Sequence, residues 1–545
     1  MTILSETKNK HGVAVFLAAI FGVFFAYKAN AVFSCAVFFE IFFFSVFGFK
    51  TKIAWFLSAI IGAQIASVLC IGTYIPELLL SNIGYANDVG IFVILKSAIF
   101  FFAGTLFSFV ISTNIHIIPP PPISLVNNKT KVVFVLIFIS TNCFVVRTPA
   151  VSFLHTFGNY FNSSFVKHSL TEKHQQAVLY KKEFVYDETV LIRETPDLRD
   201  KNIIVFFVEG FGAFEIDKYN DYKNLTPNIS AFMEKSIRFE NYFNHTAATF
   251  RGLRGQLTSS YQLLGGFNPD RNGIGEINAN EIRRKYQNTL VSLPDILNRH
   301  GYHTYFATAH SNDNNLNIML RNLLFTRTFG YEDFSKAKDL SDQELFNAVI
   351  ELTLSGKLEK PFFLGIYNVG THLGQDSPDI KYGTADNEYL NTVHNLDDAF
   401  GRFLKEYDKS PLANDTVIIL TADHTAFPSP LLKETFKLND ETDQFFLNRI
   451  PLIVYYKGIS PKTFNADGKN SLDFAPTVLS LLRINDATNY FLGCSLFEHL
   501  CPRDFHYYES IGKSYFTSEN AQIRPLKRKS KAAKRIKKFF ALSEN

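Results

Sequence analysis

Cysteine is scarce in this sequence, with only five residues among 545. Cys35, Cys70 and Cys143 lie in strongly apolar stretches, where a free cysteine behaves as a small hydrophobic side chain. Cys494 and Cys501 remain. In an oxidising compartment these two could close a small disulfide loop, and a pair of reduced cysteines is the alternative. The sequence also lacks an internal repeat, which excludes a repeat architecture.

A clear cleavage site of small residues is missing after the first apolar stretch, which argues against a removable signal peptide. Four more apolar stretches follow, and each approaches the roughly 20 residues that a membrane-spanning helix requires. We therefore expect an N-terminal transmembrane domain, residues 1–147, folded as a five-helix bundle. The five predicted spans are 12–27, 30–49, 53–75, 90–112 and 131–146.

Basic residues are depleted from alternate loops between these spans. The depleted loops hold only Lys28 or the acidic Glu77 and Asp88. The lysine pairs that occupy the other positions are Lys8 and Lys10, Lys50 and Lys52, and Lys129 and Lys131. The positive-inside rule places the N-terminus in the cytoplasm, so five crossings place everything after Arg147 outside the cell membrane, on its periplasmic or extracellular side.

Two charged residues, Glu40 and Lys96, fall within predicted spans. Intramembrane charges are candidate functional sites, although Glu40 could simply pair within the bundle and Lys96 could extend to the interface. Residues 148–200 form a predicted interfacial linker. Apolar residues recur there at helical spacing, which favours a helix that lies at the membrane interface or packs on the next domain. They are Leu154, Phe157, Phe161 and Phe165.

From residue 201 onward, apolar runs alternate with helical patterns, which predicts a mostly parallel sheet covered by helices. We assign this domain to residues 201–510. The predicted strands are 202–208, 303–307, 361–367, 416–421 and 451–455. The predicted helices are 228–234, 292–300, 342–355, 388–406 and 473–482.

Residues 511–545 are predicted to be a basic tail, because residues 524–538 hold nine lysines or arginines. A basic block can bind nucleic acid, but outside the cytoplasm an anionic lipid or lipopolysaccharide surface fits better. We expect no nucleic-acid partner. A solvated, disordered tail is the alternative.

Polar residues follow two of the predicted strands directly. Glu209 comes after the first strand, and Asp423 and His424 come after the fourth. The carboxyl ends of parallel strands meet at one edge of a sheet, so these side chains are expected to lie together. Carboxylates and a histidine are suitable ligands for Zn²⁺ or Mn²⁺. A strand-end acid that caps a helix is the simpler explanation for Glu209 alone.

Hydroxyl and cationic side chains complete the candidate site. Thr246 and Thr249 precede an expected helix whose N-terminus would attract phosphate, and Arg251 and Arg254 could bind phosphate oxygens. A metal ion beside a threonine suggests an activated nucleophile, although a threonine helix cap is the plain alternative. Histidines also follow predicted strands and could bind phosphate or act as general acids. They are His310 and His372, whereas His245 and His303 are expected to be structural.

A series of short motifs runs in order over roughly 201–495. They are Val208-Glu209-Gly-Phe, Thr226-Pro227-Asn228-Ile, Thr249-Phe-Arg-Gly, Thr371-His372, Thr421-Ala-Asp423-His424, Pro451-Leu-Ile-Val and Asp473-Phe-Ala-Pro476-Thr477. In these motifs the chain resembles the membrane-anchored members of the alkaline phosphatase and sulfatase superfamily. That group includes lipoteichoic acid synthase, phosphoglycerol transferases and phosphoethanolamine transferases of lipid A or lipooligosaccharide.

The resemblance implies a sulfatase-like α/β fold and a role for each site residue. Glu209, Asp423, His424 and Thr249 would hold one divalent ion, Zn²⁺ or Mn²⁺ with Mg²⁺ possible. Thr249 would be the nucleophile, and it suits the family pattern better than Thr246. The residues aligned with substrate-binding positions, or placed to bind phosphate, are His372, His310, Arg251 and Arg254.

The implied activity is transfer of a phospho-alcohol headgroup through a phosphothreonine intermediate. Phosphoethanolamine is preferred and phosphoglycerol is possible. The donor would be a membrane phospholipid, and the acceptor an envelope glycan or glycolipid such as lipooligosaccharide. A formylglycine-forming cysteine is missing at the site, which disfavours sulfate ester hydrolysis. The alternatives are a membrane-anchored phosphodiesterase or phosphatase, a non-catalytic scaffold and, less well supported, a transporter.

Overall fold

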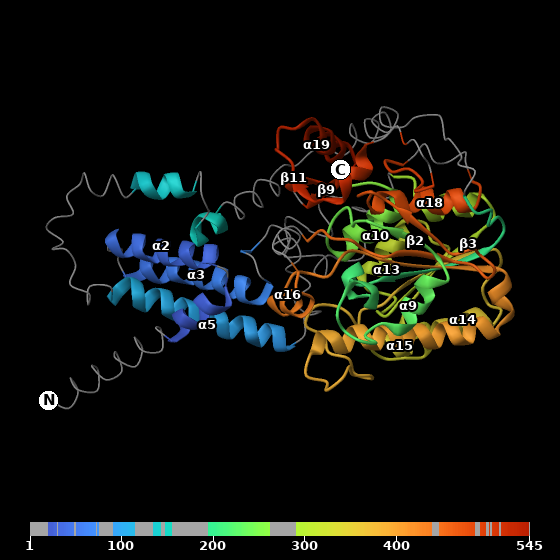
Figure 1. Cartoon of the computed structure of the whole chain (residues 1–545), viewed down its shortest axis with the longest axis horizontal. Helices are drawn as coiled ribbons and strands as arrows, with labels where there is room; N and C mark the ends of the chain where they lie inside the picture. Colours follow the sequence, from blue (N-terminus) through green and yellow to red (C-terminus); the bar gives the residue numbers. More distant parts are fainter. Residues whose placement is uncertain are drawn as a thin grey trace. The chain divides into compact units, whose positions relative to one another are not determined.

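The computed structural model divides into two compact units, one with the N-terminal helices and one with the α/β domain, and each is described by itself (Figure 1). The Pro119–Pro122 run, Cys143 and the apolar residues from Phe157 to Phe165 lie outside the described part. The described residues are 20–29, 31–47, 51–71, 74–75, 91–114, 135–142, 148–154, 195–261, 290–438, 446–484, 491–497, 501, 504–511 and 514–543.

The N-terminal unit consists of apolar helices that overlap the predicted spans, and of a short helical stretch, 149–154, in the predicted linker. The named helices are α2 (Ala31–Phe47), α3 (Thr51–Ile71) and α5 (Ile91–Asn114), and residues 20–28, 135–142 and 149–154 are also helical. Among the described residues, the stretch Lys52–Cys70 of α3 is the one helix that is long and apolar enough to cross a membrane. Multiple crossings therefore remain a prediction.

Small residues allow α3 and α5 to pack closely. A Cβ atom at Gly104 would lie 3.2 Å from the Cα atom of Gly62, so any larger residue would push the two backbones apart. The rings of Trp55 and Phe109 stack nearby, with centroids 3.9 Å apart. Close packing through small residues is typical of helices in a membrane.

The buried carboxylate of Glu40 is satisfied within this unit. Its oxygens accept hydrogen bonds from the Thr148 hydroxyl at 2.6 Å and the Ala150 amide at 2.8 Å. Pairing inside the helices, the simpler of the two predictions, is therefore what the structure contains. Lys96 is exposed on α5.

The α/β domain is built on an eight-stranded, mostly parallel sheet, as predicted. In spatial order the strands are β4 (Arg327–Phe329), β3 (His303–Thr308), β5 (Phe362–Tyr367), β1 (Asn202–Val208), β6 (Thr416–Ala422), β7 (Leu452–Tyr455), β2 (Ile237–Glu240) and β8 (Lys462–Asn465). The first five strands are parallel to one another, and β7 is antiparallel to both of its neighbours. Such a sheet must be covered on both faces.

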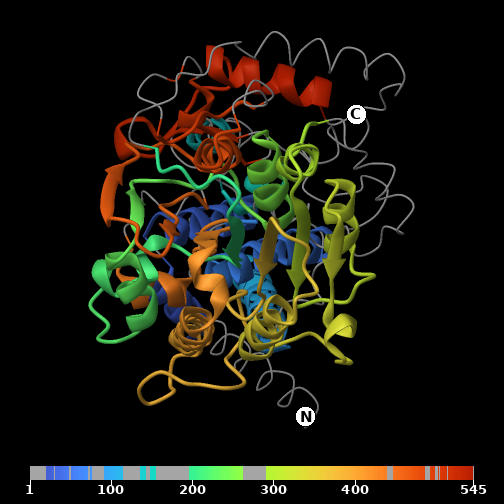
Figure 2. The same cartoon turned by 90° about the vertical axis from the view of Figure 1, so that its right-hand side faces the viewer.

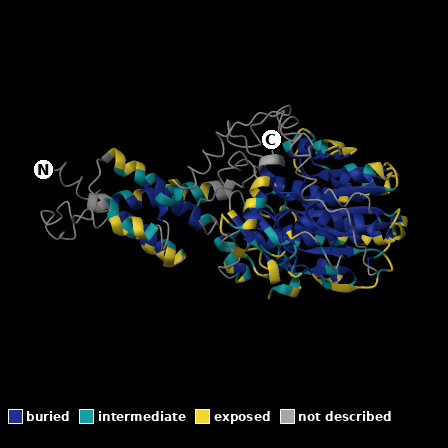
Figure 3. Cartoon of the chain, turned by 90° about the horizontal axis from the view of Figure 1, so that it is seen from above, coloured by how far each residue is buried: buried dark blue, intermediate teal, exposed yellow. Residues whose placement is uncertain are grey.

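Alternate side chains of the central strand β1 enter opposite layers. Phe206 packs its ring against Phe346 of α14 (Asp342–Leu354) and Phe400 of α15 (Glu388–Lys409). Phe207 points the other way and meets Phe474 of α18 (Phe474–Leu481). Figures 1 and 2 show α14 and α15 on one side of the sheet and α10 and α18 on the other. Figure 3 shows how continuously buried residues fill the space between these layers.

All five predicted strands and all five predicted helices are present, with ends that differ by up to three residues. The other helices are α9 (Pro227–Glu234), α10 (Thr249–Thr258), α12 (Leu293–Arg299), α13 (Asn315–Asn322) and α16 (Pro430–Phe436). Capping side chains mark the starts of several helices in this domain. Ser341 caps α14 by accepting a hydrogen bond from the Glu344 amide, and Asn387 caps α15 in the same way.

The basic C-terminal segment is folded, so the alternative of a disordered tail does not hold for the described residues. It forms a small antiparallel sheet with a helix packed on it. The elements are β9 (Tyr508–Ile511), β10 (Ser514–Thr517), β11 (Arg524–Pro525) and α19 (Lys531–Ser543). The rings of Phe539 and Phe540 are buried against Tyr261. Cys494 and Cys501 form a disulfide, the first of the two predicted alternatives.

Replacing Phe206 with alanine should destabilise the α/β domain by about 3 to 5 kcal/mol, because the change removes a ring buried between three aromatic neighbours. Hydrogen–deuterium exchange of the β1, β5 and β6 amides in the full chain measures this loss. Leu354→Ala is the control, since Leu354 is 48% exposed and its truncation should change stability by less than about 0.5 kcal/mol. Equal protection in the two variants would contradict this account of the core.

Candidate metal and nucleophile site

The register of three parallel strands places the site residues at one edge of the sheet. Val208 of β1 is paired with Ala422 of β6, and Phe207 is paired with Tyr367 of β5. The next residue along β1 is Glu209 and the next along β6 is Asp423, so the two carboxylates emerge side by side. The chain then turns away at Gly210, whose φ of +52° suits glycine.

Glu209, Asp423 and His424 form a buried group. Their exposed fractions are 2%, 0% and 1%, and one ligand atom from each lies within 4.8 Å of the others. The Nε2 atom of His424 is 3.6 Å from Glu209 Oε1 and 3.5 Å from Asp423 Oδ2. The prediction that these side chains lie together agrees with this geometry.

The unsatisfied atoms of this group fit a bound cation. Asp423 Oδ1 accepts hydrogen bonds from the Gly210 and His424 amides at 2.9 and 2.7 Å, whereas the buried Oδ2 atom has no hydrogen-bond partner. His424 Nδ1 lies 2.7 Å from the Thr425 carbonyl oxygen. A proton on Nδ1 leaves the lone pair of Nε2 directed at the carboxylates, as in a metal-binding histidine. The group could therefore hold a divalent metal ion.

The electrostatics of the group also favour a positive ion. Burial, reinforced by the nearby Glu209, raises the pKa of Asp423 well above its usual value. Burial also opposes the charged form of His424, whose pKa is lowered. Asp423 and His424 thus resist charging in their buried positions, because charge is costly to remove from water unless an opposite charge compensates it. Glu209 differs: despite the opposing effect of burial, the nearby His424 and His372 hold its pKa below the usual value. A cation between the ligands would supply that compensation.

Thr249 begins α10 next to this group. Its hydroxyl donates a hydrogen bond to Glu209 Oε2 at 2.9 Å and lies 3.2 Å from the Tyr367 hydroxyl. The preceding residue, Ala248, has φ 73° and ψ 140°, a conformation that an alanine rarely adopts. Such strain is typical of functional sites. The Thr246 hydroxyl instead donates to the Ser510 carbonyl oxygen at 2.7 Å, so it is already engaged elsewhere.

Tyr367 is a site residue that the sequence analysis missed. Its buried hydroxyl donates a hydrogen bond to Glu209 Oε2, and burial raises its pKa well above the usual value, so it remains a donor. It is the last residue of the predicted strand 361–367, where an aromatic residue usually indicates core. Its position directly before a polar Asn-Val-Gly-Thr-His segment was the available signal.

The four predicted phosphate-binding residues have different contacts near this edge of the sheet. His372 and Arg251 interact electrostatically with the buried group, through Glu209 and His424 respectively. His310 is nearly buried, pairs with Asp339 at 2.9 Å and has its ring 6.4 Å from that of Tyr367. Arg254 is buried one helical turn beyond Arg251 on α10. Their roles stay predictions.

The two histidines expected to be structural lie elsewhere. His245 is fully buried against Ser471, with Nδ1 2.6 Å from the serine hydroxyl, and burial lowers its pKa to about 3. His303 begins β3 and its Nε2 atom is 3.6 Å from Glu359.

Neighbouring side chains fix both halves of the site. The Glu209 amide donates to Asn368 Oδ1 at 3.0 Å, and the Thr371 hydroxyl donates to the Glu209 carbonyl oxygen. On the other side, the Gln256 side chain of α10 donates to the Asp423 carbonyl oxygen at 3.1 Å. A Cβ atom at Gly252 would overlap that same carbonyl. Only glycine therefore lets α10 lie against the residue that carries the carboxylate.

A family model described as Sulfatase matches residues 201–484. Lipoteichoic acid synthase 2 of Bacillus subtilis (strain 168) is 26% identical over 319 residues, which cover 54% of this chain and 46% of the relative. Lipoteichoic acid synthase of Staphylococcus aureus (strain USA300) is 26% identical over 334 residues, covering 55% of this chain and 48% of the relative. The chain thus spans about half the length of the curated relatives it matches.

Among solved structures, the lipoteichoic acid synthase LtaP from Listeria monocytogenes is 17% identical, with a TM-score of 0.48, and the match covers 68% of this chain and 96% of that chain. A protein in the alkaline phosphatase superfamily from Vibrio parahaemolyticus is 20% identical, with a TM-score of 0.49 and coverage of 70% and 96%.

Gly252→Ala should separate α10 from the Asp423 loop, at a cost of about 1 to 3 kcal/mol for forced packing. The measurement is hydrogen–deuterium exchange, which should increase in α10 and at His424. Gly356→Ala is the control: its φ of +71° gives this substitution a backbone cost of its own, but the added Cβ meets no atom within 4 Å. Equal exchange in α10 in the two variants would contradict this packing role of Gly252.

Proposed function

The chain belongs to the sulfatase family, whose model matches more than half of its length, and we propose that it is a metal-dependent headgroup transferase. It moves a phospho-alcohol from a membrane phospholipid to an envelope glycan or glycolipid such as lipooligosaccharide. The observation that carries this proposal is the Thr249 hydroxyl, hydrogen-bonded to Glu209 at the edge of the buried acid and histidine group. A threonine at this position favours phosphoryl transfer over sulfate ester hydrolysis, because it cannot supply the formylglycine of true sulfatases.

The reaction proceeds in two displacements. In the first, Thr249 Oγ attacks the donor phosphorus, Glu209 Oε2 is placed to accept the hydroxyl proton, and the bond between phosphorus and the diacylglycerol oxygen breaks. A proton from His310 or His372, the candidate general acids, passes to the diacylglycerol oxygen as it leaves, and a phosphothreonine diester remains. In the second displacement the same histidine accepts the proton of the acceptor hydroxyl that attacks this phosphorus, and Glu209 returns its proton to Thr249 as the bond from threonine to phosphorus breaks. Each displacement thus forms one phosphorus–oxygen bond and breaks one.

Glu209, Asp423, His424 and the Thr249 hydroxyl would hold a single divalent cation, Zn²⁺ or Mn²⁺ with Mg²⁺ as a further candidate. When bound, it would supply Lewis-acid stabilisation of the threonine oxygen.

Four side chains near the site are assigned to the substrate. The cationic groups of Arg251 and Arg254 and the imidazoles of His310 and His372 neutralise the charge on the phosphoryl oxygens. The electrostatic interactions of Arg251 with His424 and of His372 with Glu209 support this for two of the four. Tyr367 is added as a positioning residue, because its hydroxyl contacts both Glu209 and Thr249.

The headgroup is phosphoethanolamine or phosphoglycerol. The resemblance to lipooligosaccharide phosphoethanolamine transferases ranks phosphoethanolamine first. Phosphoglycerol is supported by the curated relatives, which are named lipoteichoic acid synthases, and by the Arg251-Gly-Leu-Arg254 sequence that resembles that branch. The sequence also lacks the cysteines that flank the nucleophile in lipid A phosphoethanolamine transferases.

The proposed arrangement in the membrane has five spans in residues 1–147, an interfacial linker over 148–200 and the catalytic domain, 201–510, outside the cytoplasm. The membrane-length stretch of α3 supports the anchor. The Cys494–Cys501 disulfide supports an oxidising compartment. An anchor in the same bilayer as a lipid donor raises the donor's effective concentration and so favours transfer over hydrolysis.

The first test is mass spectrometry of peptides from the full chain, incubated in detergent with phosphatidylethanolamine or, separately, phosphatidylglycerol. We expect an adduct on Thr249 whose mass names the headgroup, and its absence from Thr249→Ala. Thr246→Ala is the matched control, because its hydroxyl is engaged by Ser510 and the adduct should persist.

Three results would contradict parts of the proposal. Diacylglycerol release without an adduct would indicate a phosphodiesterase or phosphatase. An adduct that persists in Thr249→Ala would show that Thr249 is not the nucleophile. Neither adduct nor diacylglycerol release with any phospholipid, from folded protein, would leave a non-catalytic scaffold.

A further inference from the structure

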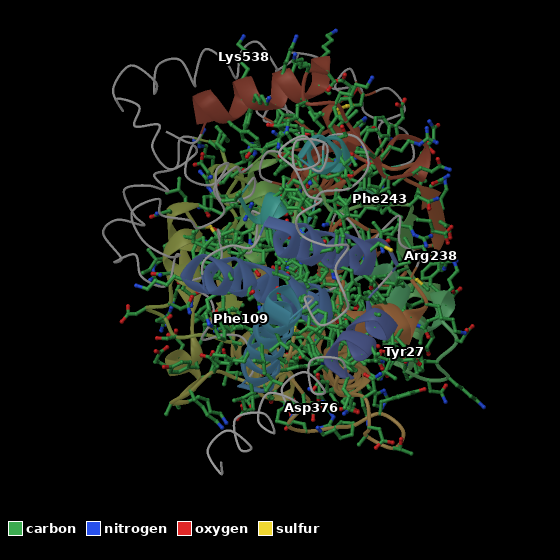
Figure 4. All side chains as sticks on the ribbon, turned by 90° about the vertical axis from the view of Figure 1, so that its left-hand side faces the viewer. Tyr27, Phe109, Arg238, Phe243, Asp376 and Lys538 are labelled. Atoms are coloured by element: carbon green, nitrogen blue, oxygen red, sulfur yellow. A yellow bond between two sulfur atoms is a disulfide. The ribbon has the colours of Figure 1, made fainter. Side chains whose placement is uncertain are left out.

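The segment from Arg524 to Lys538 carries an exposed surface of a single charge sign. Between Glu519 and Glu544 the sequence contains no acidic residue. Eight cationic residues of this segment, which we call the basic ridge, are exposed. They are Arg524, Lys527, Arg528, Lys529, Lys531, Lys534, Lys537 and Lys538. Figure 4 shows nitrogen-tipped side chains projecting outward from the helix that carries Lys538.

The opposite side of α19 anchors the ridge to the domain. Ala533, Ile536 and Phe539 are buried in an apolar cluster with Tyr261 and residues of the small sheet. Because the apolar side of the helix is already covered, α19 cannot insert it into a bilayer as a free amphipathic helix does. The helix therefore holds its charged side at a defined place on the domain surface.

Internal ion pairs do not neutralise the loop and first helical turn of the ridge. The half-buried Arg535 points inward, pairs with Asp504 at 2.5 Å and has its guanidinium 4.1 Å from the centre of the Phe505 ring. In the described part of the chain, no carboxylate lies within 4 Å of the ridge residues of the loop and first helical turn. Those residues are Lys527, Arg528, Lys529, Lys531 and Lys534. Their positive field is thus directed at solvent.

The composition of the ridge favours a lipid surface over a nucleic acid or a sugar chain. Most of its members are lysines, which act as flexible point charges and recognise no particular geometry. Aromatic rings that would stack on bases are missing from its outer side, since both phenylalanines of α19 point into the domain. Basic segments are attracted electrostatically to anionic bilayers. This chain carries a row of lysines and also contains a membrane-length helix.

We propose that the basic ridge docks the α/β domain onto the anionic headgroups of a lipid bilayer. The attraction is electrostatic, involves no insertion of apolar side chains and does not discriminate between anionic lipids of equal charge. The proposal is independent of headgroup transfer, because no ridge residue belongs to the Glu209, Asp423 and His424 group or contacts Thr249.

The test uses the full chain held in nanodiscs of phosphatidylcholine and measures capture by added vesicles. The probe is equimolar phosphatidylcholine and phosphatidylserine, compared with phosphatidylcholine alone. We expect capture by the anionic vesicles only, with loss of binding as salt is raised. Substituting Lys527, Lys529, Lys531 and Lys534 together with glutamine should weaken capture at least roughly tenfold.

Matched controls separate the ridge from net charge and from catalysis. A second variant replaces four exposed lysines elsewhere on the same domain with glutamine and should bind like the wild type. Those lysines are Lys357, Lys360, Lys405 and Lys457. Thr249→Ala should also bind like the wild type. An unchanged amide exchange pattern in α19 shows that the ridge variant is folded, since lysine and glutamine have similar helix propensities.

Three outcomes would overturn the proposal. The first is equal capture of the two four-lysine variants, and the second is equal capture by neutral and anionic vesicles. The third is binding of soluble polyphosphate by the nanodisc-held chain without any capture by the anionic vesicles, which would assign the ridge to a soluble polyanion.

Discussion

The parallel pairing of β1 with β5 and β6 is the constraint on which the candidate site depends. Three apolar strands end at the same level of the sheet, so the polar residues that follow them are forced into one small volume. Glu209 and Asp423 would repel each other there without a compensating charge. A slip of one residue in either pairing would turn the last side chains of a strand to the opposite face and separate the carboxylates.

The helix that carries Thr249 is fixed to this edge by contacts of a different kind. Gly252 permits the close approach, and the Gln256 side chain donates hydrogen bonds to the carbonyl oxygens of Ala422 and Asp423 at the end of β6. The strained Ala248 turns the chain into the helix. Thr249, the proposed nucleophile, is therefore positioned by the same loop that carries Asp423. Chemistry and packing are coupled at this point, because any change that shifts α10 also moves the threonine relative to Glu209.

Sequence patterns predicted the parts of the fold that have strong periodicity. The continuous apolar run of β1 and that of β6 indicated buried parallel strands, and this in turn indicated where Glu209 and Asp423 meet. Strand β2 alternates buried and half-buried residues and β8 is mostly exposed, but each has only four residues, too few for the pattern to be recognised. Tyr367 was missed because a tyrosine at a strand end is usually part of the core. In α19, the many lysines obscured the helical spacing of Ile536 and Phe539, whose burial depends on distant residues such as Tyr261.

The central claim is that the buried acid and histidine group is a cation site built by the sheet. Metal analysis of the purified full chain, equilibrated with trace Zn²⁺ and Mn²⁺, tests it directly. Asp423→Asn keeps an oxygen for the two backbone amides but replaces the unsatisfied Oδ2 with an amide group. Glu215→Gln is the control, because burial raises the pKa of Glu215 to about 8, so a neutral amide there should change the charge little at pH 7. We expect a single bound ion in the wild type and in Glu215→Gln, and its loss in Asp423→Asn. Equal metal content in all three proteins would contradict it.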